Sequence, residues 1–252
     1  MKTHKEEYTA RYHEMGIDRH MRLQCLCNYM EEAAGIHAML LGAGMDRLGN
    51  ENLAWVLTKL RLCLLSDLPE AGECFFVETW PVKIERVQFR RDFEVTDATG
   101  RIIATAVTQW VVMGLGTRRV ERFPSYIISM QPEQPRLAQQ EGDIRIPSLP
   151  EDSRIGPSFP VRLADIDQNQ HVNNGRYVDF ALEAAHVAGM RGTLRQLELI
   201  FRAEGLRGDI IGSKSQTEEA SGGELRSIHS LYREGDGQEL ARARTVWEQL
   251  GL

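Results

Sequence analysis

The segment from Asp165 to Tyr177 gathers the side chains of this sequence that are best suited to acid–base chemistry. It reads DIDQNQHVNNGRY, and Asp167, Asn169 and His171 follow one another at intervals of two residues. An aspartate supplies an ionised carboxylate, a histidine titrates near neutral pH, and an asparagine amide can hold a carbonyl group or a water molecule. Together these groups suit a hydrolysis reaction.

The same segment leads into a predicted helix that begins near Asn174. Tyr177, Ala181, Ala184 and Ala188 fall on one face of that helix. The start of a helix offers backbone N–H groups and the positive end of the helix dipole, and both stabilise negative charge that develops on a carbonyl oxygen during acyl transfer. The sequence therefore places acid–base groups beside a candidate oxyanion site.

Three other interpretations compete for this segment. Its first residues are spaced like a calcium-binding EF-hand loop, but Gln170 stands where that loop has glycine and Arg176 stands where it has glutamate. A serine hydrolase of the GxSxG type is excluded because the motif is absent. The third interpretation is that these Asn and Asp residues only cap a helix and shape turns, which such residues often do. Spacing alone leaves that interpretation open.

A repeated order of elements surrounds this segment. Residues 22–41 place apolar side chains at helical spacing before Gly42 and Gly44, which is typical of an amphipathic helix with a glycine stop. Runs typical of strands follow the helix, and the same order returns after a Pro-rich stretch at 124–158. The predicted strands cover Leu53–Leu64, Cys74–Trp80, Phe89–Val95, Ile102–Met113, Gln196–Ala203, Asp209–Ser215, Leu225–Tyr232 and Glu239–Trp247.

The two halves also share sequence. EMGIDRHMRL at 14–23 aligns with DIDQNQHVNN at 165–174, and TGRIIATAVTQW at 99–110 aligns with DGQELARARTVW at 236–247. Self-similarity of this kind indicates a duplicated unit. We therefore predict an α+β protein of two tandem units, in which an antiparallel sheet covers a long helix because neither apolar surface can stay in water.

The first copy has lost most of the chemistry of the second. In the alignment His20 matches His171, but Gly16 and Asp18 occupy the places of the second copy's carboxylate and amide. Without those two groups the first copy cannot carry the same acid–base set. One active site per chain is therefore predicted.

Composition narrows the class of protein. The formal net charge of -6 argues against a dedicated nucleic-acid-binding protein, which would carry a basic surface for phosphate contacts. The N-terminal segment has no apolar signal-peptide core, and no run approaches the ~18 apolar residues of a membrane span. We therefore expect a cytoplasmic protein with neither nucleic acid nor membrane as partner.

The cysteines lack zinc-site spacing and are predicted to be reduced core residues: Cys25, Cys27, Cys63 and Cys74.

The motif DIDQNQHVNN, followed by GRYVDFALEA, resembles the plant and bacterial acyl-acyl-carrier-protein (acyl-ACP) thioesterases. Further segments are similar to that family's N-terminal half and come in the same order: ETWP at 78–81, RRDFEV at 90–95, DATG at 97–100, TQWVVM at 108–113 and TRRVER at 117–122. The resemblance implies two tandem hot-dog domains, with an N-terminal domain at 1–125 for the acyl chain, a linker at 126–158 and a catalytic domain at 159–252. It also implies hydrolysis of fatty acyl-ACP to free fatty acid and holo-ACP in fatty acid synthesis, with no cofactor and no metal.

Carried over residue by residue, the resemblance places Asp167, Asn169 and His171 in the active site together with Glu204, from the strand LELIFRAE. Strand alternation puts Glu204 on the face opposite the apolar side chains, where a groove could lie, although a solvated strand carboxylate would show the same pattern. Gly205 follows this glutamate where plant enzymes often have cysteine. A water molecule or a carboxylate must therefore attack the thioester.

The remaining site predictions concern substrate contacts. Asn173 and Asn174, from the same motif, are predicted to contact the substrate. Met30 and Met39 belong to the first helix and are predicted to line the acyl chain, because methionine adapts well to such surfaces; ordinary core packing is the alternative. His37 lies on the same apolar stripe and is predicted to be a structural histidine.

Acyl carrier protein is acidic, so its docking requires basic residues. The candidates cluster in the first copy: Arg86, Arg90, Arg91, Arg118, Arg119 and Arg122. Other functions of the same fold stay open, namely an acyl-CoA thioesterase, a non-catalytic acyl-binding protein and, more weakly, a dehydratase. The sequence does not determine the preferred acyl chain or whether two chains form a homodimer.

Overall fold

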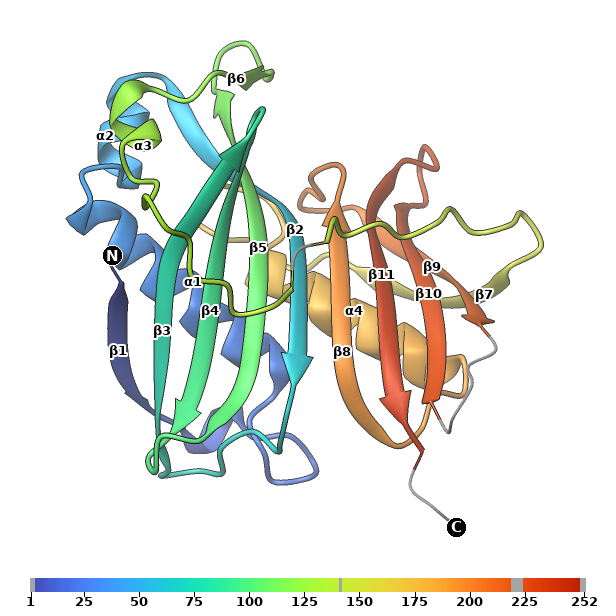
Figure 1. The fold of residues 1–252 in the computed structure, drawn as a ribbon. Coiled ribbons are helices and arrows are strands. Elements are labelled where there is room, and N and C mark those ends of the chain that lie inside the picture. The colour runs from blue at the N-terminus through green and yellow to red at the C-terminus, as the bar shows by residue number, and fades with distance from the viewer. Residues whose placement is uncertain (1–2, 141, 219–223, 250–252) are drawn as a thin grey trace. The chain divides into compact units, whose positions relative to one another are not determined.

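The computed structural model describes residues 3–140, 142–218 and 224–249. The chain divides into two compact units, Met1–Gly142 and Asp143–Leu252, which we call unit 1 and unit 2. Each unit contains a long helix and an antiparallel sheet (Figure 1), as the sequence repeat predicts. The segment predicted as a linker, 126–158, contributes residues to both units.

Unit 1 packs its sheet on helix α1 (Leu23–Leu40). Its strands pair in the order β1-β3-β4-β5-β2, and β6 pairs with β5. The strands are β1 (His4–Thr9), β2 (Leu53–Leu64), β3 (Cys74–Glu85), β4 (Gln88–Asp97), β5 (Ile102–Gly114) and β6 (Val120–Glu121), and the short helices are α2 (Met45–Asn50) and α3 (Ser125–Ile128). The predicted helix and the four predicted strands of this half are confirmed. The edge strand β1 gives no sequence signal because HKEEYT has no apolar alternation.

The buried face of α1 forms the main core of unit 1. Leu26, Met30 and Ala33 recur at helical spacing and are at most 2% exposed. The chain leaves the helix through Gly42, whose φ of 73° is a left-handed conformation that glycine adopts at little steric cost. The sheet contributes fully buried side chains to this core, among them Phe75, Val77, Leu62 and Phe93.

A second core closes the end of unit 1 where α1 stops. It joins α2, α3 and the neighbouring ends of β4 and β5 through Ala43, Leu48, Phe89, Val112, Phe123, Ile127 and Met130. The indole Nε1 of Trp55 donates a 2.9 Å hydrogen bond to the carbonyl of Ala43 and ties β2 to this cluster. The loops at this end of the sheet are therefore anchored by apolar packing.

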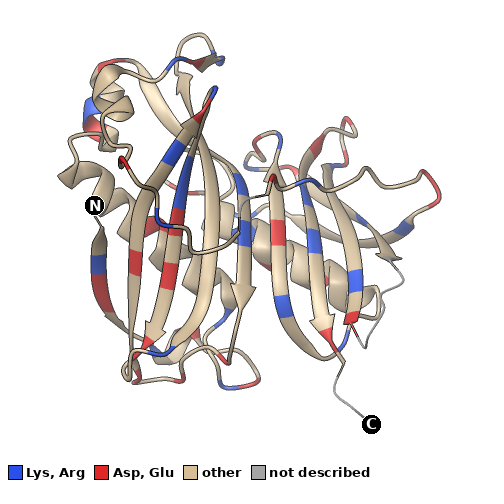
Figure 2. Ribbon diagram, in the orientation of Figure 1, with Lys and Arg blue, Asp and Glu red and all other residues tan. Residues whose placement is uncertain are grey.

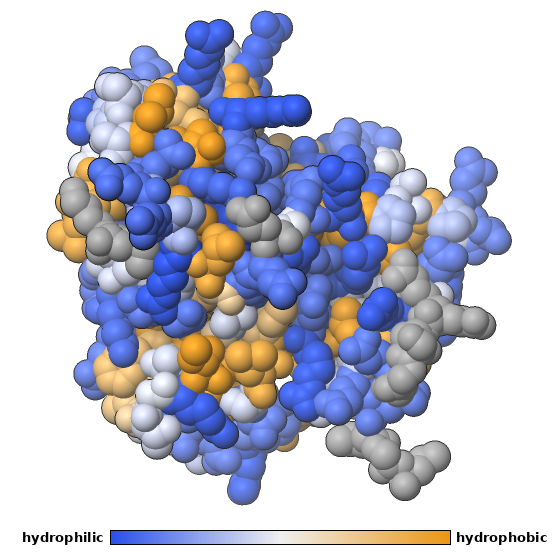
Figure 3. Space-filling model, viewed as in Figure 1, coloured by the Kyte–Doolittle hydropathy of each residue, from blue (hydrophilic) through white to orange (hydrophobic). Residues whose placement is uncertain are grey.

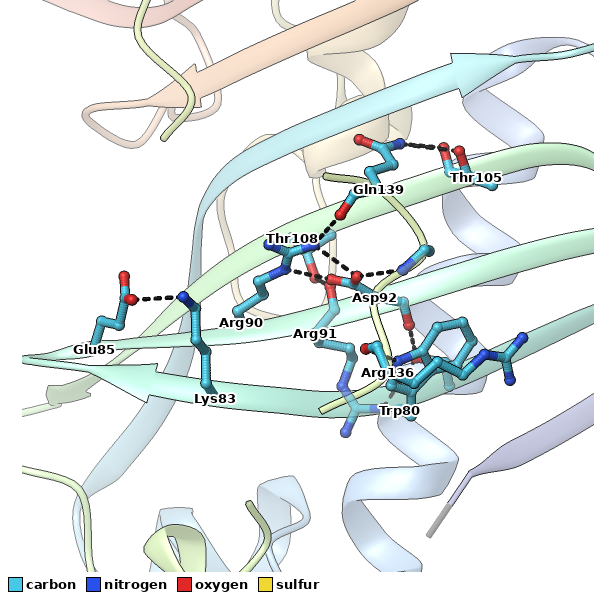
Figure 4. A network of polar contacts seen from close by, with 12 residues as sticks. Trp80, Lys83, Glu85, Arg90, Arg91, Asp92, Thr105, Thr108, Arg136 and Gln139 are labelled. Carbon is cyan, nitrogen blue, oxygen red and sulfur yellow. Dashed lines mark hydrogen bonds and ion pairs between the residues drawn. The ribbon is translucent and has the colours of Figure 1, made fainter. Parts of the chain in front are cut away.

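Residues 136–139 lie across the face of the unit 1 sheet that points away from α1 (Figure 4). Asp92 is fully buried and accepts hydrogen bonds from Arg90 Nε at 2.7 Å, from Arg90 Nη2 at 2.8 Å and from the backbone N–H of Ala138 at 2.9 Å. Arg90 Nη2 also donates to the carbonyl of Gln139 at 3.0 Å. A buried ion pair thus fastens this segment to β4.

Arg136 provides a second attachment for the same segment. Its guanidinium lies 4.0 Å from the ring centroid of Trp80 and forms ion pairs with Glu78 and Glu94. In return, Trp80 Nε1 donates a 2.9 Å hydrogen bond to the carbonyl of Arg136. This part of the segment predicted as a linker is therefore a bound component of unit 1.

The neighbouring Arg91 points to the opposite face, toward α1. Its Nη1 lies 3.0 Å from His37 Nδ1 and donates to Thr79 Oγ1 at 3.1 Å. Burial lowers the pKa of Arg91 to about 10. His37 is 3% exposed, so its predicted structural role is confirmed. The prediction that Arg90 and Arg91 dock acyl carrier protein is wrong, because both side chains are buried in the unit.

Unit 2 repeats the arrangement around helix α4 (Asn174–Val187). Its strands pair in the order β8-β11-β10-β9-β7, and they are β7 (Arg154–Pro160), β8 (Thr193–Phe201), β9 (Ile210–Glu218), β10 (Glu224–Arg233) and β11 (Glu239–Glu248). The predicted helix and strands of this half are confirmed with small shifts of their ends. Strand β7 begins inside the segment predicted as a linker and extends two residues past it; it was missed because the Gly and Pro at the centre of RIGPSFP are typical of loops. It is an edge strand with an irregular register, where such residues are tolerated.

Candidate active site

The segment before α4 is a closed loop whose backbone is fixed by its own hydrogen bonds. The N–H of Asp167 donates to the carbonyl of His171 at 3.0 Å, and the N–H of Gln170 donates to the carbonyl of Asp167 at 3.0 Å. Gln170 takes a left-handed conformation with a φ of 67°, which turns the chain back on itself. A bridge between Ile166 and Val172 closes the base of the loop.

This loop brings together the three catalytic candidates of the motif. Asp167 Oδ1 accepts a 2.8 Å hydrogen bond from the backbone N–H of Asn169, and Asp167 Oδ2 lies 3.4 Å from Asn169 Nδ2 and 3.8 Å from His171 Nδ1. The side chains of Asp167 and His171 are 18% and 25% exposed, and Asn169 is exposed. A carboxylate, an amide and an imidazole therefore meet at a partly open surface.

Asp165, the first residue of the motif, supports the loop from inside. Its side chain is 2% exposed and forms ion pairs with Arg162 at 2.9 Å and with Arg176 at 2.8 Å. Although burial favours the protonated carboxyl, hydrogen bonds from Arg162 and the charge of Arg176 hold the pKa of Asp165 below its usual value. Its carbonyl also accepts from the N–H of Asn173 at 2.9 Å. These contacts of Asp165 with Arg162, Arg176 and Asn173 tie the loop to the start of α4.

The start of α4 is already capped by Asn173. The side-chain oxygen of Asn173 accepts from the N–H of Gly175 at 2.8 Å, and its carbonyl accepts from the N–H of Arg176 at 2.9 Å. The capping interpretation that the sequence left open thus holds for Asn173. Two of the first helix amides are engaged in this cap, and Asn174 is the first helical residue. The N–H groups of Gly175 and Arg176 are therefore already bonded within the chain.

Glu204 does not lie on a strand, contrary to the prediction from LELIFRAE. Strand β8 ends at Phe201, and Glu204 follows in a loop before β9. Alternation therefore does not determine the direction of its side chain. The N–H of Val172 donates a 2.8 Å hydrogen bond to the carbonyl of Gly205. Because Val172 directly follows His171, the Glu204 loop runs beside the loop of Asp167, Asn169 and His171.

The two copies share the backbone of this loop but not its side chains. In unit 1 the N–H of Gly16 donates to the carbonyl of His20 at 2.7 Å, and the N–H of Met21 donates to the carbonyl of Pro69 at 2.9 Å. Arg19 has a φ of 72°, like its counterpart in unit 2. The His20 ring is held by the carbonyl of Leu68, 2.8 Å from its Nδ1. The first copy therefore keeps the backbone of this loop, although it lacks the acid–base side chains of the second copy.

The two methionines predicted to line the acyl chain differ in position. Met30 is 2% exposed and borders a small cleft between α1 and the sheet of unit 1. Met39 is 62% exposed and does not lie on this wall, because nine residues of helix turn its side chain to the opposite face. The cleft is otherwise lined by Cys27, Glu31, Leu57, Leu60, Phe93, Thr108 and Trp110.

Within the part of the chain that the structure describes, no group of three or more His, Cys, Asp or Glu side chains is arranged to hold a metal ion. Of the described helices, none combines the length and apolar character required to cross a membrane. None of the four cysteines forms a disulfide bond within the described part of the chain; Cys25 and Cys27 are buried as predicted, whereas Cys63 and Cys74 are only partly buried.

Family comparisons agree with this fold. The family model for the acyl-ACP thioesterase N-terminal domain matches residues 1–130, and that for the acyl-ACP thioesterase C-terminal domain matches residues 150–249. The two matches together cover most of the chain. The chain therefore belongs to the acyl-ACP thioesterase family, and its two units are tandem hot-dog domains, as predicted.

Individual relatives are similar along almost the whole chain. The chloroplastic palmitoyl-acyl carrier protein thioesterase of Cuphea hookeriana is 28% identical over 257 residues, which cover 96% of this chain and 61% of that protein. Oleoyl-acyl carrier protein thioesterase 1 of Arabidopsis thaliana, also chloroplastic, is 27% identical over 277 residues, which cover 98% of this chain and 76% of that protein. The chain thus spans roughly 61% to 76% of the length of these curated relatives.

A solved structure extends the similarity to three dimensions. The 12:0-ACP thioesterase from Umbellularia californica superposes with a TM-score of 0.83 at 25% sequence identity, covering 98% of this chain and 94% of that one.

Proposed function

We propose that this protein hydrolyses the thioester of fatty acyl-ACP and releases a free fatty acid and holo-ACP. The observation that carries the proposal is the convergence of Asp167, Asn169 and His171 in one loop, with Asp167 Oδ2 3.8 Å from the imidazole. The family membership of the whole chain supports the same reaction. No other loop of this kind in the described residues carries a carboxylate, an amide and an imidazole together, since unit 1 has glycine at the first of these positions.

In the proposed reaction a water molecule attacks the thioester carbonyl carbon. Asp167 and Glu204 position and activate that water, His171 shares the proton, and the Asn169 amide stabilises the oxyanion. The C–S bond then breaks, and the carrier thiolate leaves and takes up a proton. A thiolate is a good leaving group, so modest acid assistance is sufficient. Gly205 has no side chain and supplies no nucleophile.

The proposed site for the acyl chain is the cleft in unit 1 beside Met30. Its walls are mostly apolar and come from α1, β2, β4 and β5. Apolar side chains favour a hydrocarbon tail because burial removes its surface from water. Asn173 and Asn174 are proposed to contact the polar part of the substrate beside the catalytic loop.

The proposed reaction is tested by offering matched acyl-ACP and acyl-CoA substrates and analysing the products by mass spectrometry. We expect free fatty acid from a series of acyl-ACPs, with a higher kcat/KM than for the same acyl-CoA. A preference for acyl-CoA would instead favour the acyl-CoA thioesterase alternative. Tight acyl binding without turnover would identify a non-catalytic acyl-binding protein and refute hydrolysis.

Docking of the acidic carrier is proposed at the end of unit 1 that bears the β3–β4 hairpin and the turn between β5 and β6. Lys and Arg gather at this end in Figure 2, and long hydrophilic side chains project from it in Figure 3. The exposed arginines here are Arg86, Arg118, Arg119 and Arg122. The hairpin and the turn lie close together in the sheet. Val112 of β5 pairs with Glu121 of β6, and Trp110 of β5 pairs with Phe89 near the start of β4.

Reversing two of these charges is expected to weaken carrier docking. The double variant Arg118→Glu, Arg119→Glu should raise KM for acyl-ACP roughly tenfold at low ionic strength, with little change in kcat, because charges on the rim of an interface act on encounter. The matched control is Arg145→Glu, Arg154→Glu, two exposed arginines of unit 2. Steady-state kinetics across a salt series measures both. Equal KM values for the two double variants, or no dependence on salt, would refute this docking surface.

A further inference from the structure

The loop that carries Glu204 is held by its backbone at three successive residues. The carbonyl of Glu204 accepts a 2.8 Å hydrogen bond from Arg233 Nη2. The N–H of Gly205 donates to Tyr177 Oη at 3.1 Å, and the carbonyl of Gly205 accepts from the N–H of Val172 at 2.8 Å. The N–H of Leu206 donates to Asp209 Oδ2 at 2.8 Å. A loop with so many fixed points holds its carboxylate-bearing residue in one place.

Tyr177 is the member of this set that comes from the catalytic helix itself. It lies on the first turn of α4, three residues after the start of the helix, and its side chain is almost fully buried. Its ring makes edge contacts with Phe180 and Phe201, with centroids 6.1 Å and 5.8 Å away. These rings fix the direction of the phenol. The hydroxyl therefore presents a rigid acceptor to the Gly205 N–H.

The contact between this hydroxyl and the loop leaves no space for a side chain at position 205. A Cβ atom added to Gly205 would lie 2.8 Å from Tyr177 Oη, 3.0 Å from Val172 Cγ2 and 3.4 Å from a methyl group of Ile211. The backbone of the loop is thus packed directly on the helix and on the residue that follows His171. Glycine at this position is explained by that close approach.

We propose that Tyr177 is a positioning residue for the reaction: through the Gly205 N–H, its hydroxyl fixes Glu204 beside the Asp167–Asn169–His171 loop. The inference rests on the proposed function, because it requires Glu204 to take part in hydrolysis. Catalytic groups must be held within a fraction of an ångström, since a displacement of about 1 Å can reduce the rate on the order of 100-fold. Arg233 and Val172 hold the same loop from two other directions, so loss of the tyrosine hydroxyl displaces the loop without unfolding it.

The test removes the hydroxyl alone. Tyr177→Phe keeps the ring packing and should lower kcat for acyl-ACP by about 10- to 100-fold while KM stays within about twofold, because substrate binding does not depend on Glu204 being in place. The matched control is Tyr29→Phe in unit 1. Tyr29 is also buried, and its hydroxyl donates a 2.7 Å hydrogen bond to Glu14. That variant also loses a buried, hydrogen-bonded tyrosine hydroxyl and should keep the wild-type kcat.

A double-variant cycle separates this inference from the proposed function. If Tyr177 acts through the carboxylate, Tyr177→Phe should cost far less in a Glu204→Gln background than in the wild type. Wild-type activity of Glu204→Gln would remove Glu204 from the reaction and the inference with it. Loss of activity in Glu204→Gln, combined with an unchanged kcat or a changed KM in Tyr177→Phe, would leave the proposed function standing and overturn the positioning role alone. Fully additive losses in the cycle would overturn it in the same way.

Discussion

The Asp167→Asn variant is expected to hydrolyse acyl-ACP about 100- to 10,000-fold more slowly than the wild type, with KM little changed. In the proposed mechanism the carboxylate charge of Asp167 activates water, and asparagine removes that charge. The loop should survive the substitution, because the side-chain oxygen of asparagine can still accept the 2.8 Å hydrogen bond from the N–H of Asn169. Loss of rate without loss of fold would therefore report on chemistry alone.

Asp18→Asn is the matched control for this experiment. Asp18 lies in the equivalent loop of unit 1, where its Oδ1 accepts a 3.1 Å hydrogen bond from the N–H of His20. The chemical change and the local hydrogen bond are the same, but Gly16 leaves this loop without the acid–base set. We expect wild-type kcat for Asp18→Asn. Thermal unfolding should give equal midpoints for both variants, and near-wild-type turnover by Asp167→Asn would remove the loop from the mechanism.

The sequence predicts this loop well because its geometry is local. The turn at Gln170, the capping by Asn173 and the approach of Asp167 to His171 all involve residues a few positions apart. Their hydrogen bonds are determined by the backbone of one short segment. The repeat strengthens the prediction, because unit 1 folds a related sequence into the same backbone. What spacing alone could not decide was which of the Asn and Asp side chains of this segment caps the helix.

The position of Glu204 shows where local patterns stop being informative. Alternation in LELIFRAE predicts a strand through residue 204, but the strand ends at Phe201. The loop that follows is determined by contacts with Tyr177, Val172 and Arg233, which lie about thirty residues away on either side. Long-range contacts of this kind leave no periodic signal in the sequence. The glycine at 205 is the only local sign of the close packing.

The prediction that Arg90 and Arg91 dock acyl carrier protein is wrong for a related reason. RRDFEV contains two adjacent arginines that resemble a basic surface, but successive side chains of a strand point to opposite faces. Arg91 meets His37 on α1, and Arg90 meets Asp92 beneath residues 136–139. Composition does not reveal that either arginine is covered. The Pro-rich segment that covers Arg90, for example, has the composition of a free linker. Burial of both charges follows only from the tertiary structure.

The buried Arg90–Asp92 pair gives the largest expected effect on stability. Asp92→Ala should lower the free energy of unfolding of unit 1 by about 3–5 kcal/mol, because it leaves the Arg90 guanidinium buried without its carboxylate. Asp92 also holds the Ala138 N–H, so the substitution releases the segment that crosses the sheet (Figure 4). Urea unfolding followed by tryptophan fluorescence would detect the change, since Trp80 packs against Arg136 in that segment.

An exposed ion pair and a compensating double variant give this prediction its controls. Glu248 pairs with Arg195 in unit 2, with side chains that are 56% and 40% exposed, and Glu248→Ala should cost no more than about 1 kcal/mol because water solvates both charges. Replacing both buried partners, as in Arg90→Met, Asp92→Leu, should recover much of the stability lost in Asp92→Ala, since no unpaired charge then remains inside the unit. If Asp92→Ala unfolds at the same urea concentration as Glu248→Ala, the pair is not what fastens residues 136–139 to the sheet. The anchoring would then rest on the contacts of Arg136 with Trp80 and its two glutamates.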